Sequence, residues 1–203
     1  MYYNFEHYPD PTAGGAHGNI EKEEKRLNTG KRFEADWRDS VPRSVWYYRL
    51  RDSPGNFYGG AQEGVRFTAD NICDCVLFKY PMLCLVELKT IDQKSIPLTK
   101  ILGDWKKEKG VYKKEKHIRE MAAAAQHEGI SAVVVIEFRS IRRTFAVSAA
   151  DVLAFLAAGE RKSIPWQWAA VKGIEVDQRQ LKVNWRYDVA GLLTRLEKVG
   201  ENK

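Results

Sequence analysis

The 203-residue chain has no long apolar run and few cysteines, and each of these absences excludes a class of protein or a kind of site. No stretch of about eighteen apolar residues occurs, and the first thirty residues lack the basic-then-apolar order of a signal peptide. We therefore expect no membrane partner and a cytoplasmic location. The three cysteines, Cys73, Cys75 and Cys84, lie in strand-like sequence without Cys-x-x-Cys spacing. We expect reduced, buried thiols instead of disulfides or a zinc site.

The chain also has no excess of acidic over basic residues. The 33 Lys and Arg residues outnumber the 27 Asp and Glu residues, which favours anionic partners. The charge is most uneven over residues 106–119, a basic run that contains Tyr112 and directly follows Trp105. Its basic members are Lys106, Lys107, Lys109, Lys113, Lys114, Lys116 and Arg119. Such a segment suits phosphate backbones, although a solvated helix face or an exposed loop is the alternative interpretation.

The order of apolar patterns predicts one α/β domain. Residues 1–29 show no sustained period, so we expect a poorly ordered arm followed by a single domain over residues 30–203 with a basic insertion near 103–116. The pattern predicts a helix from residue 117 to Gly129 and a loop around Trp166 and Trp168. No internal repeat is apparent. Strands flanked by helices on this scale indicate a mixed central β-sheet.

Residues 72–90, "ICDCVLFKYPMLCLVELKT", are an apolar stretch that contains Asp74, Glu87 and Lys89. If the stretch folds as a hairpin centred on the bond before Pro81, paired positions sum to 161, and Asp74 lies directly opposite Glu87. Proline does not suit a two-residue hairpin turn, so this register requires a four-residue loop or a cis-proline turn.

Two directly opposed carboxylates repel each other, because their β-carbons lie only about 4.5 to 5.5 Å apart. A cation between them removes the repulsion, and carboxylate oxygens suit Mg²⁺, with Mn²⁺ as a substitute. Lys89 shares the strand face of Glu87, where an ammonium can stabilise a phosphoryl group under attack or orient the attacking water. The alternative is that these charges lie on the solvated face of an edge hairpin, with Lys89 offsetting Glu87.

Asp74 followed by Glu87-Leu88-Lys89 resembles the PD-(D/E)xK nuclease signature. The segments around it, in order, resemble RecU-type Holliday junction resolvases and their phage-borne relatives over about residues 30–195. The matching segments are "GKRFEADW", "KSIPL", "HIREMAAAAQHEG", "ISAVVVIEF" and "AGERKSIP". The resemblance implies a restriction-endonuclease-like fold, which is a mixed central β-sheet flanked by helices.

The resemblance also implies a chemistry. Asp74 and Glu87 become metal ligands, Glu34 completes the metal shell, and Lys89 stabilises the transition state. The expected reaction is Mg²⁺-dependent phosphodiester hydrolysis by a homodimer that cuts a four-way DNA junction in recombination and repair. The chain departs from the family at Cys73, where relatives usually have Ser or Thr. It also has only a short segment before Asp74, where the family has a projecting stalk.

Other interpretations of these residues remain. A nuclease acting on other branched or single-stranded DNA, or a DNA-binding protein that does not cut, is compatible with the sequence. Asp70 is a rival to Asp74, and Glu34 suits a helix start through the helix dipole alone. The candidate DNA contacts are Arg49, Arg51, Arg66, Lys106, Lys107, Lys109, Lys113, Lys114, Arg161 and Lys162.

Overall fold

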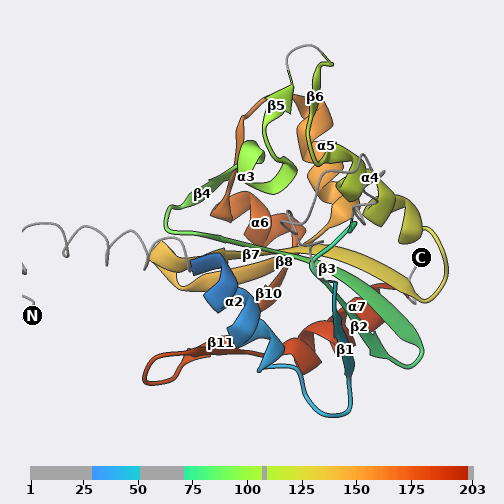
Figure 1. Cartoon of the computed structure of the whole chain (residues 1–203), viewed down its shortest axis with the longest axis vertical. Coiled ribbons are helices and arrows are strands. Elements are labelled where there is room, and N and C mark those ends of the chain that lie inside the picture. The colour runs from blue at the N-terminus through green and yellow to red at the C-terminus, as the bar shows by residue number, and fades with distance from the viewer. Residues whose placement is uncertain (1–28, 51–70, 107–108, 201–203) are drawn as a thin grey trace, which may run out of the picture.

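The computed structural model describes residues 29–50, 71–106 and 109–200. A six-stranded sheet with the order β1-β2-β3-β7-β8-β10 forms the centre (Figure 1). Its strands are β1 (Trp46–Arg49), β2 (Cys75–Lys79), β3 (Met82–Ile91), β7 (Ile130–Phe138), β8 (Arg143–Ser148) and β10 (Ile174–Val176). Strands β3 and β7 are parallel, and the other neighbours are antiparallel. The predicted mixed central sheet is confirmed.

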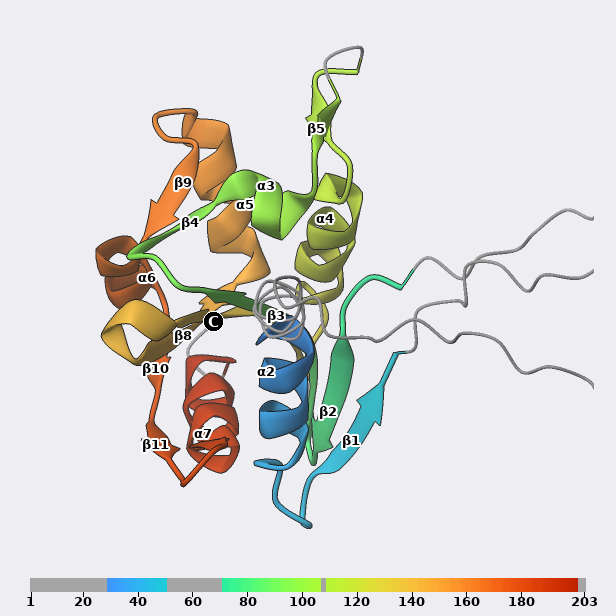
Figure 2. The ribbon, with the colours of Figure 1, turned by 60° about the vertical axis from the view of Figure 1, so that its left-hand side comes forward.

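Helices cover both faces of this sheet (Figure 2). Helices α2 (Thr29–Arg38) and α7 (Val189–Gly200) pack on one face, and four others pack on the opposite face. These four are α3 (Leu98–Leu102), α4 (Glu115–Ala124), α5 (Ala149–Ala158) and α6 (Trp166–Lys172). Side chains of β3 alternate between two buried clusters, so this strand is apolar on both faces where it crosses the core. No helix within the described residues has the length and apolar character needed to cross a membrane.

Local signals explain several helix boundaries. The Ser148 hydroxyl accepts a hydrogen bond from the Asp151 N–H at 3.0 Å and caps α5, and Gly159, with φ of 65°, ends it. Helix α2 begins at Thr29, one residue before the expected domain start; residues 1–28 lie outside the described residues. Helix α4 ends at Ala124, before the predicted stop, because the chain must turn into β7, where the Gly129 carbonyl accepts from the Leu83 N–H at 2.7 Å.

Two copies of the sequence Lys-Ser-Ile-Pro, at residues 94–97 and 162–165, pair with each other as β4 (Ser95–Pro97) and β9 (Ser163–Pro165). The buried side chains of Ile96 and Ile164 face each other. The Leu98 N–H donates to the Lys162 carbonyl at 2.9 Å, and the Trp166 N–H donates to the Lys94 carbonyl at 3.0 Å. A helix follows each copy, and the predicted Trp-rich loop is instead helix α6.

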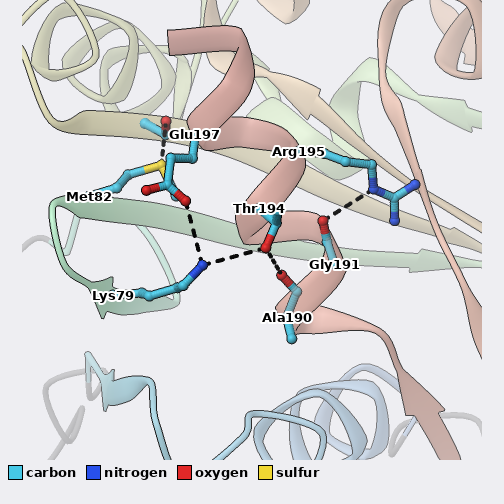
Figure 3. A network of polar contacts seen from close by, with 8 residues as sticks. Lys79, Met82, Ala190, Gly191, Thr194, Arg195 and Glu197 are labelled. Atoms are coloured by element: carbon cyan, nitrogen blue, oxygen red, sulfur yellow. Dashed lines mark hydrogen bonds and ion pairs between the residues drawn. The ribbon is translucent and has the colours of Figure 1, made fainter. Parts of the chain in front are cut away.

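Two short antiparallel pairs complete the chain, β5 (Trp105–Lys106) with β6 (Val111–Tyr112) and β11 (Gln178–Gln180) with β12 (Trp185–Tyr187). The β2–β3 hairpin ends against α7 (Figure 3). There the Lys79 ammonium lies 3.4 Å from Thr194 Oγ1 and 3.5 Å from Glu197 Oε2. This contact holds one end of the hairpin, and Asp74 lies at the opposite end.

Candidate active site

The register of the β2–β3 hairpin is the predicted one. Cys75 pairs with Val86 and Lys79 pairs with Met82, so paired positions sum to 161. The Tyr80–Pro81 peptide is cis, which is one of the two turns that this register allows. Asp74 directly precedes β2, at the position that the register sets opposite Glu87 in β3.

Asp74 ends the β2–β3 ladder with its main chain and its side chain. Its N–H donates to the Val86 carbonyl at 3.1 Å, and its Oδ2 accepts from the Leu88 N–H at 2.7 Å. Its carbonyl accepts from the Leu50 N–H at 3.0 Å. The carboxylate therefore takes the place of the next strand carbonyl, and it is fixed beside β3 at the point where the chain leaves the sheet.

Lys89 brings the two carboxylates together. Its ammonium forms an ion pair with Glu87 Oε1 and lies 4.0 Å from Asp74 Oδ2. The side chains of Lys89 and Glu87 are only 14% and 9% exposed, whereas that of Asp74 is 33% exposed. Because β3 lies between β2 and β7, the alternative of a solvated edge hairpin is wrong for Glu87. The cluster is instead a largely buried group of charges with one carboxylate open to solvent.

Burial and charge act against each other in this cluster. Burial raises the pKa of Glu87, with Lys89 opposing the rise and Asp74 adding to it. Burial also tends to lower the pKa of Lys89, but the charges of Glu87, Asp74 and Glu34 outweigh it, so this pKa is raised. Lys89 therefore stays protonated and acts as the counter-ion of both carboxylates.

Glu34 lies on α2, and its Oε2 is 2.5 Å from Nη2 of Arg49. Its charge contributes to the raised pKa of Lys89, so it lies within electrostatic reach of the cluster. Within the described part of the chain, no group of three or more His, Cys, Asp or Glu residues is placed to hold a metal ion. Glu34 forms its ion pair with Arg49, and its place in a three-carboxylate metal shell stays a prediction. Asp74 and Glu87 offer a pair of hard oxygen donors that fits Mg²⁺ or Mn²⁺.

The three cysteines take no part in this chemistry. All are free and buried, as predicted. Burial raises the pKa of Cys73 to about 12 and that of Cys84 to about 12, and it raises the pKa of Cys75 as well. They remain neutral thiols, and a neutral thiol is a poor metal ligand.

The candidate DNA contacts fall into separate groups. Lys106, Lys109, Lys113 and Lys114 belong to an exposed ribbon, formed by β5 and β6, that projects from the body of the molecule (Figures 1 and 2). The charge of Lys114, at its foot, opposes the rise in the pKa of Glu87. Two further candidates, Arg161 and Lys162, are exposed on the turn between α5 and β9. Arg51, Arg66, Lys107 and Asp70 lie outside the described residues.

Sequence reasoning missed a buried carboxyl group behind the cluster. Glu137 in β7 accepts hydrogen bonds from Thr90 Oγ1 at 2.6 Å and from Tyr187 Oη at 2.8 Å. Burial raises its pKa, although both hydrogen bonds oppose the rise. Thr90 directly follows Lys89, so these bonds fix β3 next to the cluster. The available signal was a single acidic residue in the β-branched run of residues 130–138.

Comparisons with known proteins give little beyond this geometry. No protein-family model matches the chain, and a search of curated proteins finds no match. Among solved structures, the chain is similar to Hjc from Archaeoglobus fulgidus, a Holliday junction resolvase from an archaeal hyperthermophile. The two share 13% sequence identity with a TM-score of 0.38, over 76% of this chain and 94% of that chain. A likeness at this level assigns neither a family nor an activity.

Proposed function

We propose that the chain is a metal-dependent endodeoxyribonuclease whose active site is formed by Asp74, Glu87 and Lys89. The observation that carries this proposal is the convergence of two carboxylates and one ammonium on a largely buried face of the central sheet. Burying the charges of Glu87 and Lys89 is costly, and a hydrophobic pair would stabilise the fold at least as well. A catalytic role explains why the charges are placed there.

Each residue has a distinct part in this mechanism. Asp74 and Glu87 would hold Mg²⁺, or Mn²⁺ in its place, which would supply an activated water and polarise the scissile phosphate. Lys89 would donate to the phosphoryl oxygen that gains charge, or orient the attacking water. The Leu88 N–H points toward β2, and in a strand the carbonyl of the same residue points to the same edge. That carbonyl is a third candidate oxygen donor.

Binding of a DNA phosphate by Arg49 would release Glu34 from its ion pair. The arginine is about half exposed, so a DNA phosphate can compete with Glu34 for its guanidinium. A carboxylate released in this way would complete the metal shell predicted from the resemblance.

We further propose that the substrate is a four-way DNA junction and that the enzyme works as a homodimer in recombination and repair. The ordered resemblance to RecU-type resolvases supports this substrate, and paired symmetric cuts require two sites related by a two-fold axis. The alternative is a nuclease acting on other branched or single-stranded DNA. The short segment before Asp74, where the family has its stalk, favours this alternative. A DNA-binding protein that does not cut would have no use for the buried carboxylate pair.

The test is a Mg²⁺-dependent cleavage assay on synthetic four-way junctions, flaps, continuous duplexes and single strands. Symmetric paired nicks confined to junctions are expected. Asp74→Asn and Glu87→Gln should abolish cleavage while leaving DNA affinity intact or stronger. Cutting of flaps or single strands alone would support the alternative substrate. Equal loss of binding and cutting in both variants would make the carboxylates structural and overturn the proposal.

A further inference from the structure

Backbone hydrogen bonds hold the two strands of the β5–β6 ribbon together. Trp105 pairs with Tyr112, and Lys106 pairs with Val111. At its foot, the Lys114 N–H donates to the Leu102 carbonyl at 2.6 Å and the Lys113 N–H donates to the Asp104 carbonyl at 2.9 Å. At its tip, the Gly110 N–H donates to the Lys106 carbonyl at 2.9 Å, with Gly110 at φ of 62°. The arm rises from the same side of the molecule as α4 and α5 (Figure 1).

Helix α4 braces the ribbon from the side. The Tyr112 N–H donates to Glu115 Oε2 at 3.3 Å, and the other oxygen of this carboxylate lies 2.5 Å from Nη2 of Arg119. Glu115 is buried although it is charged, so its charge is used within the protein. The brace sets the direction in which the ribbon points.

A basic cavity of about 520 Å3 lies between the ribbon and α4. The two carboxylates that line it, Glu115 and Glu120, are already paired with Arg119 and Lys116. The exposed lysines of the ribbon that also line it form no ion pair with any residue that the structure describes. They are Lys106, Lys109 and Lys113. This uncompensated charge suits a chain of phosphates.

An aromatic surface stands next to the lysines. The Trp105 ring is 4.8 Å from that of Tyr112 at an interplanar angle of 68°, and Trp105 is 48% exposed. Trp105 also lines a second cavity, of about 440 Å3, together with Leu153 and Leu156 of α5. A fixed, half-exposed indole above apolar side chains is a surface on which a nucleobase can stack.

We propose that the ribbon binds a nucleotide whose base is not covered by a neighbouring base pair, at a DNA branch point or in a single-stranded tail. Trp105 stacks on that base, and Lys106, Lys109 and Lys113 contact the flanking phosphates. Inside a continuous duplex every base face is covered by its neighbours, so only the phosphate contacts remain. The inference rests on the proposed function for its choice of DNA.

The test measures binding without cleavage. Fluorescence anisotropy in EDTA compares three DNA molecules of matched sequence, namely a four-way junction, a duplex with a single-stranded tail and a blunt duplex. Trp105→Ala should weaken binding of the junction and the tailed duplex by about fivefold to a hundredfold, as expected for one lost stacking contact. Binding of the blunt duplex should change less than about twofold, since phosphate contacts remain. Trp105→Phe, which keeps an aromatic face, should retain most of the affinity.

Trp46→Ala is the matched control, because Trp46 is 56% exposed and lies on β1, outside the ribbon. It should leave all three affinities unchanged. Equal weakening of all three DNA molecules by Trp105→Ala, or no weakening of any, would overturn the inference. If Trp105→Ala loses the selectivity for the junction and the tailed duplex, but the wild-type protein cuts no DNA, the inference is supported and the proposed function is overturned. A wild-type protein that cuts, with Trp105→Ala binding unchanged, keeps the proposed function and overturns the inference.

Discussion

The β2–β3 hairpin and the β5–β6 ribbon are both antiparallel pairs that carry lysine, but they use it in opposite ways. Lys89 on β3 is largely buried and lies between two carboxylates. The lysines on the ribbon are exposed, and those lining its basic cavity have no carboxylate partner within the described residues. A buried charge is fixed in position and affects the pKa of its neighbours, whereas an exposed charge attracts a distant partner. This difference matches the two proposed roles, which are chemistry at the hairpin and DNA recognition at the ribbon.

The largest expected effect comes from removing the buried charge. Lys89→Met should lower the cleavage rate by about a hundredfold to a thousandfold, because it removes the ammonium expected beside the developing charge. The measurement is the single-turnover cleavage rate at saturating protein. Lys114→Met, which removes a neighbouring exposed lysine, should cost less than about tenfold. A Lys89→Met variant that cleaves within tenfold of wild type would mean that the buried lysine only balances charge.

The next effect concerns the exposed lysines. Replacing Lys106, Lys109 and Lys113 together by Ala should weaken DNA binding and flatten its salt dependence. Each lost phosphate contact reduces the slope of log affinity against log salt by about 0.9, so a total change of up to about 2.7 is expected. The control replaces Lys172 and Lys182, which are exposed elsewhere, and should leave the slope unchanged. Identical slopes for both variants would remove the ribbon from the DNA interface.

A smaller effect tests the carboxylate pair without catalysis. Mg²⁺ at ten times its dissociation constant should stabilise the wild-type fold by about 1.4 kcal/mol, which corresponds to about 3 to 6 °C in Tm. Asp74→Asn and Glu87→Gln should lose this shift, since each removes a charged ligand. Glu197→Gln, a carboxylate on α7 outside the site, should keep it. A shift of full size in both site variants would show that the ion binds elsewhere.

The hairpin register was predicted from the turn and the charges. A turn centred on the bond before Pro81 sets Asp74 opposite Glu87, and the observed pairing is this one. The apolar pattern could not decide the register alone, because β3 is apolar on both faces. The boundaries of α5 also depend on local chemistry, because Ser148 caps its start and Gly159 ends it. Burial of the charged cluster stayed open in the sequence, which also allowed a solvated edge hairpin, and it is decided by the position of β3 between β2 and β7.

The ribbon, the Lys-Ser-Ile-Pro pair and the Arg49–Glu34 ion pair could not be predicted in the same way. Two-residue strands are too short to show a period, so Trp105–Lys106 and Val111–Tyr112 leave no periodic signal. The pairing of residues 94–97 with 162–165 depends on how the helices between them pack. Arg49 was predicted to contact DNA, and its link to Glu34 arises only when β1 and α2 pack together. Predictions for residues 1–28 and for Arg51, Arg66 and Lys107 stay predictions.

The smallest expected effect lies at the other end of the β2–β3 hairpin, where Lys79 contacts α7 (Figure 3). Its ammonium lies 3.4 Å from Thr194 Oγ1 and 3.5 Å from Glu197 Oε2, and both side chains of the ion pair are about one-third exposed. An ion pair in this setting is screened by water, so Lys79→Ala should lower the free energy of unfolding by less than about 0.5 kcal/mol. Denaturant unfolding measures this change, and cleavage should stay within twofold of wild type. A loss above about 1.5 kcal/mol would mean that anchoring to α7, and not burial of the charged cluster, governs how the hairpin is held.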